Sequence, residues 1–223
     1  PLLVPGLALV PSATGIGFDG AAPAPDAADT DADAWVIGPG LSGASAPKDT
    51  ETVLELIVGT RSPSVLDADA LNAIARSNRR ISLPGRVLTP HPGEAERLAR
   101  CYGVRFDTGS PQARVETARR LAEATAAVVV LKGAGTVVAE PDAPGWTCRH
   151  GHACLATGGT GDVLAGLLGG LLAQSVAGDW PLTPAEVARC AVDAHARAAE
   201  RWSQTRGAEA GLLAQELADL LPE

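Results

Sequence analysis

The sequence predicts an α/β fold in which a mainly parallel sheet is covered by helices on both faces. Short apolar runs that suit buried strands alternate along the chain with segments of helical periodicity. Glycine-rich or acidic loops follow the strand-like runs, where ligands bind in open parallel sheets. A length of 223 residues, 46% of them apolar, suits one such domain with a sizeable core.

The first part of the chain carries two strand-like runs and one helical segment. Residues 7–10 predict a short buried strand, and residues 21–33, rich in Ala, Pro and Asp, predict a surface loop or an acidic helix. Residues 34–37 predict a second buried strand. It ends at the glycine-rich loop 38–43, which suits either a ligand-binding loop or a plain turn. Helical periodicity follows over residues 49–58.

The next strand ends in two acids. It begins at Ser64 and reaches Asp67 and Asp69, ahead of a helix predicted over residues 70–77. Asp67 would stand at the carboxyl end of a parallel strand, where a carboxylate can hold Mg²⁺ or a ligand hydroxyl. The alternative is that Asp69 caps the helix and that Asp67 is a solvated loop acid.

A histidine and a glutamate follow the strand predicted over residues 86–88. The loop 89–94 contains two prolines, which stiffen it and present His91 in one geometry. Glu94 begins a helix predicted over residues 95–101. The alternative interpretations are a solvated loop histidine and an ordinary first-turn acid.

A lysine stands at the end of the most continuous strand. Residues 110–125 predict an amphipathic helix with a serine as its cap, and the β-branched run 126–131 predicts a fully buried parallel strand. Lys132 comes next, beside glycines, and can hold a phosphate as a point charge. Because another strand is predicted over residues 137–139, the intervening loop could equally be a mere hairpin.

Two cysteines and two histidines stand close together ahead of the glycine-rich motif. They are Cys148, His150, His152 and Cys154. These residue types bind zinc, but no Cys-x-x-Cys spacing is present and the ligands would have to close around their own backbone. The pattern therefore disfavours a zinc site.

The remaining chain is organised around the glycine-rich motif at residues 156–162, which opens an apolar helix predicted over residues 163–172. Glycines let backbone N–H groups approach an anion, and the N-terminus of a helix attracts phosphate. Asp162 can cap this helix, and it can also act as a base beside a bound phosphate. The alternative is a glycine-rich turn with an ordinary N-cap.

The C-terminal part of the chain is helical. Apolar residues at helical spacing predict a helix over residues 184–202 and a last amphipathic helix over residues 211–221. His195 lies in the first of these helices, where a packed or partly exposed histidine is the favoured interpretation.

Composition excludes several classes of partner. The net charge of −8 argues against nucleic acid and against an anionic membrane surface. No apolar run reaches transmembrane length and no signal peptide is visible, while the 4 spread cysteines indicate reduced thiols in the cytoplasm. Since the chain has no methionine and opens at Pro1, we expect a fragment or a processed product.

In a parallel sheet the carboxyl-end loops share one crevice, so the candidate residues should meet at one rim. A helix terminus, a lysine and several carboxylates together suggest Mg²⁺-assisted chemistry on a nucleotide phosphate. The residues expected there are Gly40, Asp67, His91, Glu94, Lys132 and Asp162.

These motifs resemble those of the ADP/ATP-dependent NAD(P)H-hydrate dehydratases, a branch of the ribokinase-like superfamily. The resemblance implies a ribokinase-like three-layer fold. It covers the chain from about residue 34 to its end, and the His-Pro-Gly-Glu loop separates this branch from the rest of the superfamily. The segments that carry it are residues 36–41, 65–71, 88–94, 130–133 with Thr136, 155–162 and 212–217.

The resemblance implies a repair reaction that returns hydrated NADH or NADPH (NADHX, NADPHX) to NAD(P)H at the expense of ADP or ATP. Asp162 matches the catalytic residue, which also contacts the substrate, and Gly40 and His91 match substrate-binding positions. From its chemistry, Glu94 is a candidate to orient Mg²⁺ through water. The positions that match nucleotide-binding residues are Lys132, Gly133, Ala134, Gly135, Thr136, Gly159, Thr160 and Gly161.

The chain also departs from the family. Cys148 and His152 stand where the family usually has Asn, and family members carry a further segment ahead of Pro1. We therefore expect residues 1–223 to form a single domain that lacks its front and is impaired alone. We also expect a homo-oligomer, possible fusion to an NAD(P)H-hydrate epimerase in a parent chain, and neither nucleic acid nor membrane as a partner.

Two other functions compete with this interpretation. One is a small-molecule kinase of the same superfamily, acting on a vitamin precursor or a sugar alcohol; the His-Pro-Gly-Glu loop argues against it. The other is an inactive nucleotide-binding or oligomer-forming module, and the retained Asp162 argues against that.

Overall fold

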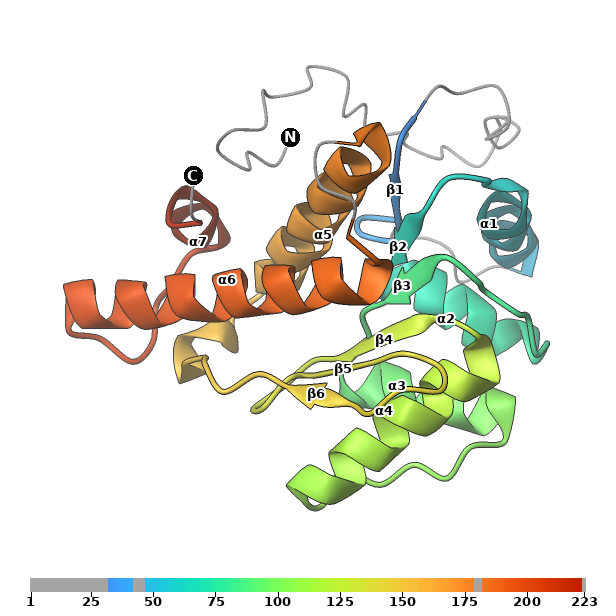
Figure 1. Ribbon diagram of the computed structural model, residues 1–223, viewed down its shortest axis with the longest axis horizontal. Helices are drawn as coiled ribbons and strands as arrows, with labels where there is room; N and C mark the ends of the chain where they lie inside the picture. The colour runs from blue at the N-terminus through green and yellow to red at the C-terminus, as the bar shows by residue number, and fades with distance from the viewer. Residues whose placement is uncertain (1–31, 42–46, 179–181, 222–223) are drawn as a thin grey trace.

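The computed structural model describes residues 32–41, 47–178 and 182–221, which form a sheet flanked by helices (Figure 1). Its strands are β1 (Trp35–Ile37), β2 (Ser64–Leu66), β3 (Arg86–Leu88), β4 (Val128–Leu131), β5 (Val137–Ala139) and β6 (Trp146–Thr147). Its helices are α1 (Pro47–Gly59), α2 (Ala68–Ser77), α3 (Pro92–Tyr102), α4 (Pro111–Thr125), α5 (Thr160–Ala177), α6 (Pro184–Arg206) and α7 (Ala214–Asp219), with a short 3₁₀ turn at Ala153–Leu155.

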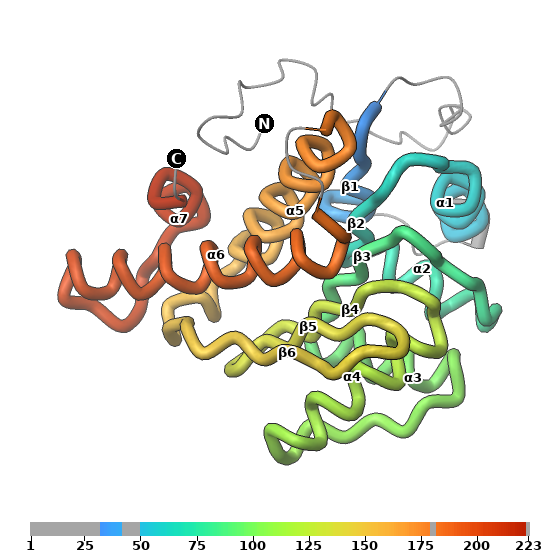
Figure 2. Tube along the Cα trace, viewed as in Figure 1, coloured from blue at the N-terminus to red at the C-terminus, as the bar shows by residue number. Residues whose placement is uncertain are grey.

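The strands follow one another across the sheet in chain order, with β1 at one edge and the hairpin of β5 and β6 at the other (Figure 2). Strands β1 to β4 are parallel, while β5 runs antiparallel to β4 and β6 antiparallel to β5. The mainly parallel sheet that the sequence predicts is therefore confirmed. The missed element is β6, whose two residues are too few to give a periodic signal.

Helices cover both faces of the sheet, so the predicted three layers are present. Alternate residues of each strand point to opposite faces, which divides the core in two. One core lies under α1 to α4 and takes Leu66, Leu88, Val129 and Leu131 from the strands. The other lies under α5, α6 and α7 and takes Val65, Val87, Val128 and Val130.

The parallel strands bring their following loops to one rim, as expected from the topology. The backbone ladder continues one residue past the strands: Asp67 N donates to Ile37 O at 3.0 Å, and Thr89 N donates to Leu66 O at 3.1 Å. Lys132 N then donates to Pro90 O at 2.9 Å. The loops after β1, β2, β3 and β4 are thus held side by side.

Several predicted boundaries need correction. Helix α2 begins at Ala68 with Asp67 at its N-cap position, so the alternative in which Asp69 caps this helix is wrong. Helix α3 begins at Pro92, ahead of the predicted start, because His91 caps it. The predicted strand at residues 7–10 and nearly all of the predicted loop 21–33 lie outside the described residues.

Helix α5 corrects the expectation that no apolar run reaches transmembrane length. Its 18 residues, Thr160–Ala177, have the length and composition of a membrane-spanning helix, and the glycines within it break the apolar pattern into shorter runs. A buried core helix has the same composition. Of that segment 44% is buried, and α5 packs against β1, β2, α6 and α7.

Candidate active site

A cavity of about 940 Å³ opens between the hairpin loop after β4, the segment after β6, the first turn of α5 and the middle of α6. Its wall includes eight of the predicted site residues, one of which is His91. The cavity is lined by His91, Pro92, Lys132, Gly133, Ala134, Gly135, Thr136, Cys148, Arg149, His150, Gly151, His152, Ala153, Leu155, Ala156, Thr160, Gly161, Leu164, Val192, His195 and Ala196. Gly159 adjoins this wall in the chain, whereas Gly40, Glu94 and Asp162 are not part of it.

The glycine-rich motif forms a tight turn that aims the N-terminus of α5 at the cavity. Gly159 is the N-cap with φ +88, and a Cβ there would lie 3.0 Å from Ala214 Cβ, so a side chain would be strained and crowded. The Thr160 hydroxyl donates to Leu155 O and Thr157 O, each at 2.8 Å. Since first-turn N–H groups have no partner within the helix, Gly161 presents one to the cavity.

Asp162 lies in the first turn of α5 and is exposed. The prediction that it caps the helix is wrong, because Gly159 occupies the N-cap and no side chain caps this end. A carboxylate in this position is favoured by the helix dipole. Its side chain remains accessible to a ligand that reaches the first turn.

Lys132 forms an ion pair that the sequence interpretation did not include. Its Nζ donates to Asp67 Oδ1 at 2.7 Å, and Asp67 is 2% exposed. Asp67 is therefore neither a solvated loop acid nor an unpaired carboxylate. A Cβ on Gly161 would lie 3.4 Å from the same Nζ, which places the ammonium group next to the first turn of α5.

His91 and Glu94 form a capping box at the start of α3. His91 Nδ1 accepts from Gly93 N at 3.0 Å, and Glu94 Oε2 accepts from His91 N at 2.8 Å. Because Nδ1 is an acceptor, the ring proton of neutral His91 is on Nε2, 3.5 Å from Glu94 Oε1. Burial raises the pKa of Glu94, although the His91 N–H and the charge of Lys132 oppose this shift.

Gly40 lies in the turn after β1, at the same rim. Its φ is +76, in the region that favours glycine, and a Cβ there would meet nothing within 4 Å. Leu41 N donates to Gly38 O at 3.2 Å and closes this turn. The space beside Gly40 suits the close approach of a ligand.

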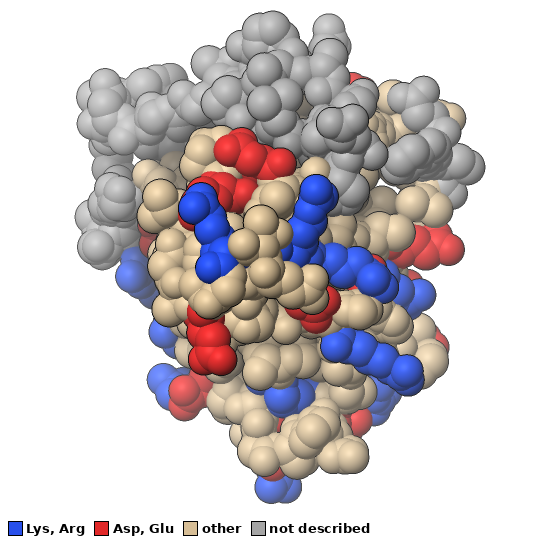
Figure 3. All heavy atoms as spheres, turned by 90° about the vertical axis from the view of Figure 1, so that its left-hand side faces the viewer, with Lys and Arg blue, Asp and Glu red and all other residues tan. Residues whose placement is uncertain are grey.

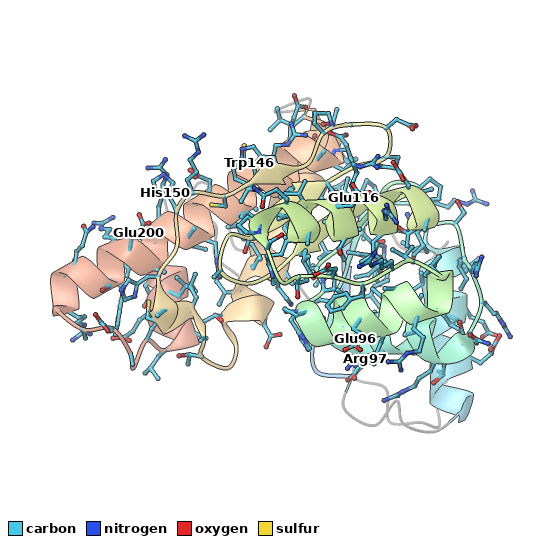
Figure 4. The ribbon with its side chains drawn as sticks, turned by 90° about the horizontal axis from the view of Figure 1, so that it is seen from below. Glu96, Arg97, Glu116, Trp146, His150 and Glu200 are labelled. Carbon is cyan, nitrogen blue, oxygen red and sulfur yellow. The ribbon has the colours of Figure 1, made fainter. Side chains whose placement is uncertain are left out.

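The segment after β6 is held by side chains of α6. Glu200 Oε1 accepts from Gly151 N at 2.9 Å, and its Oε2 lies 3.1 Å from His150 Nδ1. Figure 4 labels the side chains of Glu200, on α6, and His150. Ser203 Oγ lies 3.2 Å from His152 Nε2. Within the described ranges no group of three or more His, Cys, Asp or Glu side chains is placed to hold a metal ion.

The side chains that sequence reasoning missed are those whose partners are distant in the chain. Glu200 and Ser203 contact residues about 50 positions away. Arg114 of α4 donates to Leu131 O at 3.3 Å and Lys132 O at 3.2 Å, which fixes the start of the hairpin loop. No local pattern marks these residues, because each looks like an ordinary polar position of an amphipathic helix.

With this geometry the chain can be compared with known proteins. A family model described as NAD(P)H-hydrate dehydratase matches residues 11–223.

The chain belongs to the NAD(P)H-hydrate dehydratase family.

Two curated members of the family illustrate the similarity. The ADP-dependent (S)-NAD(P)H-hydrate dehydratase of Neisseria meningitidis is 39% identical over 193 residues, which are 84% of this chain and 61% of that protein. The bifunctional NAD(P)H-hydrate repair enzyme of Coxiella burnetii is 39% identical over 184 residues, 82% of this chain and 34% of that protein. The chain thus spans about a third of the length of the bifunctional members.

Solved structures confirm the fold. The ADP/ATP-dependent NAD(P)H-hydrate dehydratase of Bacillus subtilis, co-crystallised with ATP/Mg²⁺, superposes with a TM-score of 0.66 at 33% identity and covers 88% of this chain and 66% of that one. A ribokinase-like superfamily protein of Enterococcus faecalis superposes with a TM-score of 0.67 at 22% identity, covering 85% and 61%. The predicted ribokinase-like fold of this dehydratase family member is confirmed.

His195 joins two helices of this family member at the cavity. It is packed, as predicted: its Nε2 lies 2.9 Å from Thr160 O, and the side chain is buried. Burial lowers the pKa of His195 to about 4, and the nearby charge of Lys132 adds to this shift. His195 therefore stays neutral and donates from Nε2 to the first residue of α5.

This burial predicts an acid-sensitive fold. The unfolded state takes up the proton below pH about 6.5, whereas folded His195 resists it down to pH about 4, so stability falls as the pH drops through this window. At pH 5 the expected contribution is a loss of about 2 kcal/mol relative to pH 7. Urea unfolding of the wild type and of His195→Gln at both pH values measures it. Equal pH dependence of stability in the two proteins would show that His195 does not cause the loss of stability in acid.

Proposed function

We propose that this chain returns hydrated NADH or NADPH to NAD(P)H with ADP or ATP as the phosphoryl donor. The observation that carries the proposal is the meeting of Lys132, the first turn of α5 and His91 on one cavity, beside the exposed carboxylate of Asp162. Membership of the NAD(P)H-hydrate dehydratase family supports the same reaction.

The nucleotide is proposed to occupy the cavity, with its phosphates near Lys132 and the first turn of α5. The ammonium group and the N–H group of Gly161 supply positive charge at that end. The hairpin loop of Gly133, Ala134, Gly135 and Thr136 forms the adjoining wall. Thr136 Oγ1 donates to Gly133 O at 3.0 Å, which holds this loop closed on itself.

The hydrated dinucleotide is proposed to approach from the rim on which Gly40, His91 and Asp162 lie. Asp162 would take the proton from the ring hydroxyl as its oxygen attacks the terminal phosphorus of the nucleotide. The bond from that phosphorus to the bridging oxygen breaks, and the shortened nucleotide leaves. The N–H groups at Gly159 to Gly161 would stabilise the charge that develops on the transferred group.

Phosphorylation converts the ring hydroxyl into a leaving group. The lone pair of the ring nitrogen expels phosphate through cleavage of the carbon–oxygen bond, and loss of a proton from the neighbouring ring carbon restores the double bond. In this scheme His91, which lines the cavity, positions the dinucleotide.

The residues fit a magnesium ion that is held chiefly by nucleotide phosphates. Among the described residues, the polar contact of Glu94 Oε1 is His91 Nε2 at 3.5 Å, which leaves this oxygen able to accept from a metal-bound water. Asp67 is committed to Lys132, so it is not proposed as a ligand. When bound, the ion would neutralise charge on the phosphates of the nucleotide.

A spectroscopic assay tests the proposal. Hydrated NADH is mixed with the protein, Mg²⁺ and either ADP or ATP, and the return of nicotinamide absorbance is followed. Nucleotide-dependent return supports the dehydratase and names the preferred nucleotide. Phosphorylation of a hydroxymethylpyrimidine or a thiazole alcohol without any return would favour the alternative kinase, and nucleotide binding without turnover of either would favour an inactive module.

Gly161→Ala separates nucleotide binding from folding. The added methyl would stand 3.4 Å from Lys132 Nζ, in the space proposed for a phosphate oxygen, so nucleotide affinity should fall about tenfold. Stability should not fall, because alanine is favoured over glycine in a helix. Calorimetric titration with ADP and thermal unfolding measure the two effects.

Gly59→Ala is the matched control for this substitution. Gly59 is a helical glycine at which an added Cβ would meet nothing within 4 Å, and it lies in α1, away from the cavity. Its replacement should leave ADP affinity unchanged. Unchanged ADP affinity in Gly161→Ala as well would rule out a phosphate at this turn.

The family's bifunctional members suggest a partner activity. We propose that this chain works with, or derives from a parent fused to, an NAD(P)H-hydrate epimerase, in the cytoplasm and as a homo-oligomer. That residues 1–223 form a single domain also stays a prediction. Light scattering of the purified protein measures the oligomeric state.

A further inference from the structure

The cavity differs in charge from the rest of the molecule. The chain carries a net charge of −8, yet no aspartate or glutamate is found among the described residues that line the cavity. The cationic side chains in that wall are Lys132 and Arg149. All 4 histidines of the chain line it too.

The charge of Lys132 is already balanced inside the protein. Its ammonium group is 2.7 Å from the buried Asp67 carboxylate, and the buried Glu94 carboxylate is near enough to interact with it. Such a pair lowers the net attraction that Lys132 offers to an anion. A second cationic side chain would therefore add to the attraction that Lys132 and the first turn of α5 offer to a polyphosphate.

The histidines do not supply this charge. His91 and His152 accept from backbone N–H groups at Nδ1, which suits the neutral ring. His195 is buried and neutral, and His150 faces the Glu200 carboxylate, so any charge that it gains is balanced.

Arg149 is the remaining cation, and its place in the fold suits a phosphate. It follows Cys148, whose N–H donates to Thr136 O at 2.9 Å, so it stands beside the hairpin loop of the nucleotide site. Glu200 holds the next residues, which fixes the backbone on the other side. Arg149 itself is exposed, and the described part of the chain places no carboxylate within ion-pair distance of it.

Other arginines of α6 form ion pairs with carboxylates. Arg197 pairs with Asp193 at 2.6 Å, and Arg206 pairs with Glu216 at 2.5 Å. On this side of the molecule, where α6 ends and α7 lies, basic and acidic side chains alternate over the surface (Figure 3). Arg149 has no ion pair to any described residue and lines the cavity, whereas Arg201 of α6, for which the described residues show no ion pair either, does not line it.

We propose that Arg149 is a binding residue for the phosphate chain of the nucleotide. A guanidinium group recognises phosphate through two parallel hydrogen bonds. Here it supplies positive charge, because the charge of Lys132 is balanced by Asp67. The inference rests on the proposed function, because it takes the cavity to be the nucleotide site.

The test measures binding rather than turnover. ADP and pyrophosphate are titrated calorimetrically, with Mg²⁺, into the wild type, Arg149→Gln and Arg201→Gln. Arg201 is the matched control, an exposed arginine of α6 that does not line the cavity. Arg149→Gln should bind both ligands about tenfold more weakly, while Arg201→Gln should match the wild type. Equal thermal unfolding of the three proteins shows that folding is intact, as expected for exposed side chains.

Three results would overturn the inference. Wild-type affinity in Arg149→Gln would show that the guanidinium makes no contact. Weaker ADP binding with unchanged pyrophosphate binding would place Arg149 at the base or ribose instead. Failure of the folded wild type to bind either ligand would reject the proposed nucleotide site itself, which separates the failure of the proposed function from that of Arg149.

Discussion

Replacing Asp162 with asparagine is expected to lower the rate of nucleotide-dependent dehydration by about a thousandfold while the protein stays folded. The amide keeps the size of the carboxylate but cannot accept a proton from the ring hydroxyl. Asp162 is exposed and does not cap α5, so its replacement should cost little stability. Steady-state rates of NADH recovery, together with calorimetric ADP affinity, measure the effect.

A matched variant tests whether the loss of any one carboxylate would lower the rate. Glu55→Gln removes one exposed carboxylate from α1, on the opposite face of the sheet, and should retain full activity. The signature expected of a base is a fall in kcat with ADP affinity nearly unchanged in Asp162→Asn. Full activity in Asp162→Asn would exclude Asp162 as the base, and a collapse of both variants would point to the net charge.

The largest loss of stability is expected for Gly38→Ala. Gly38 follows β1 with φ +126, and a Cβ there would stand 1.8 Å from Asp67 O. That carbonyl accepts from Ala70 N at 3.0 Å, so it cannot move without loosening the start of α2. Backbone strain and overpacking together should lower the free energy of unfolding by about 4 kcal/mol.

The control is a second glycine of positive φ, at which an added Cβ would not clash. Gly85, in the turn before β3, has φ +74, and an added Cβ there would stand in open space. Gly85→Ala should therefore lose only about 1 kcal/mol, the cost of a left-handed alanine. Urea unfolding of both variants measures the difference. Equal losses would mean that Asp67 O can move aside and that the contact does not hold the rim.

The effect of Gly38→Ala should extend to the site. Because Asp67 also pairs with Lys132, a shift of the Asp67 backbone would disturb the ammonium group beside α5. Residual folded protein of this variant should bind ADP more weakly than Gly85→Ala does.

The fold was predicted most accurately from the sequence where the local pattern and the tertiary structure agree. The continuous β-branched run before Lys132 became β4, and its four residues are buried, since strands covered on both faces read as apolar runs. The rim predicted from parallel topology also formed, because the ladder carries Asp67 and Lys132 one step beyond their strands. Topology thus sufficed to place Asp67 and Lys132 side by side.

The local sequence pattern could not predict that these two residues form an ion pair. Asp67 and Lys132 are 65 positions apart, and nothing in either segment shows that one neutralises the other. His91 was read as a loop residue, although serine and threonine usually fill the role that its ring performs in the capping box. The contacts of Glu200 with His150 and Gly151 likewise depend on how α6 crosses the sheet, which the local sequence does not show.

The central claim is that phosphorylation of the ring hydroxyl drives the dehydration, and the fate of the hydroxyl oxygen tests it most directly. Hydrated NADH is prepared in water enriched in heavy oxygen, so that the hydroxyl carries the label, and is then incubated with the protein, Mg²⁺ and ADP or ATP in ordinary water. The account predicts that NADH returns and that the released phosphate carries the label. Returned NADH with unlabelled phosphate would contradict it, because the hydroxyl oxygen would then have left as water.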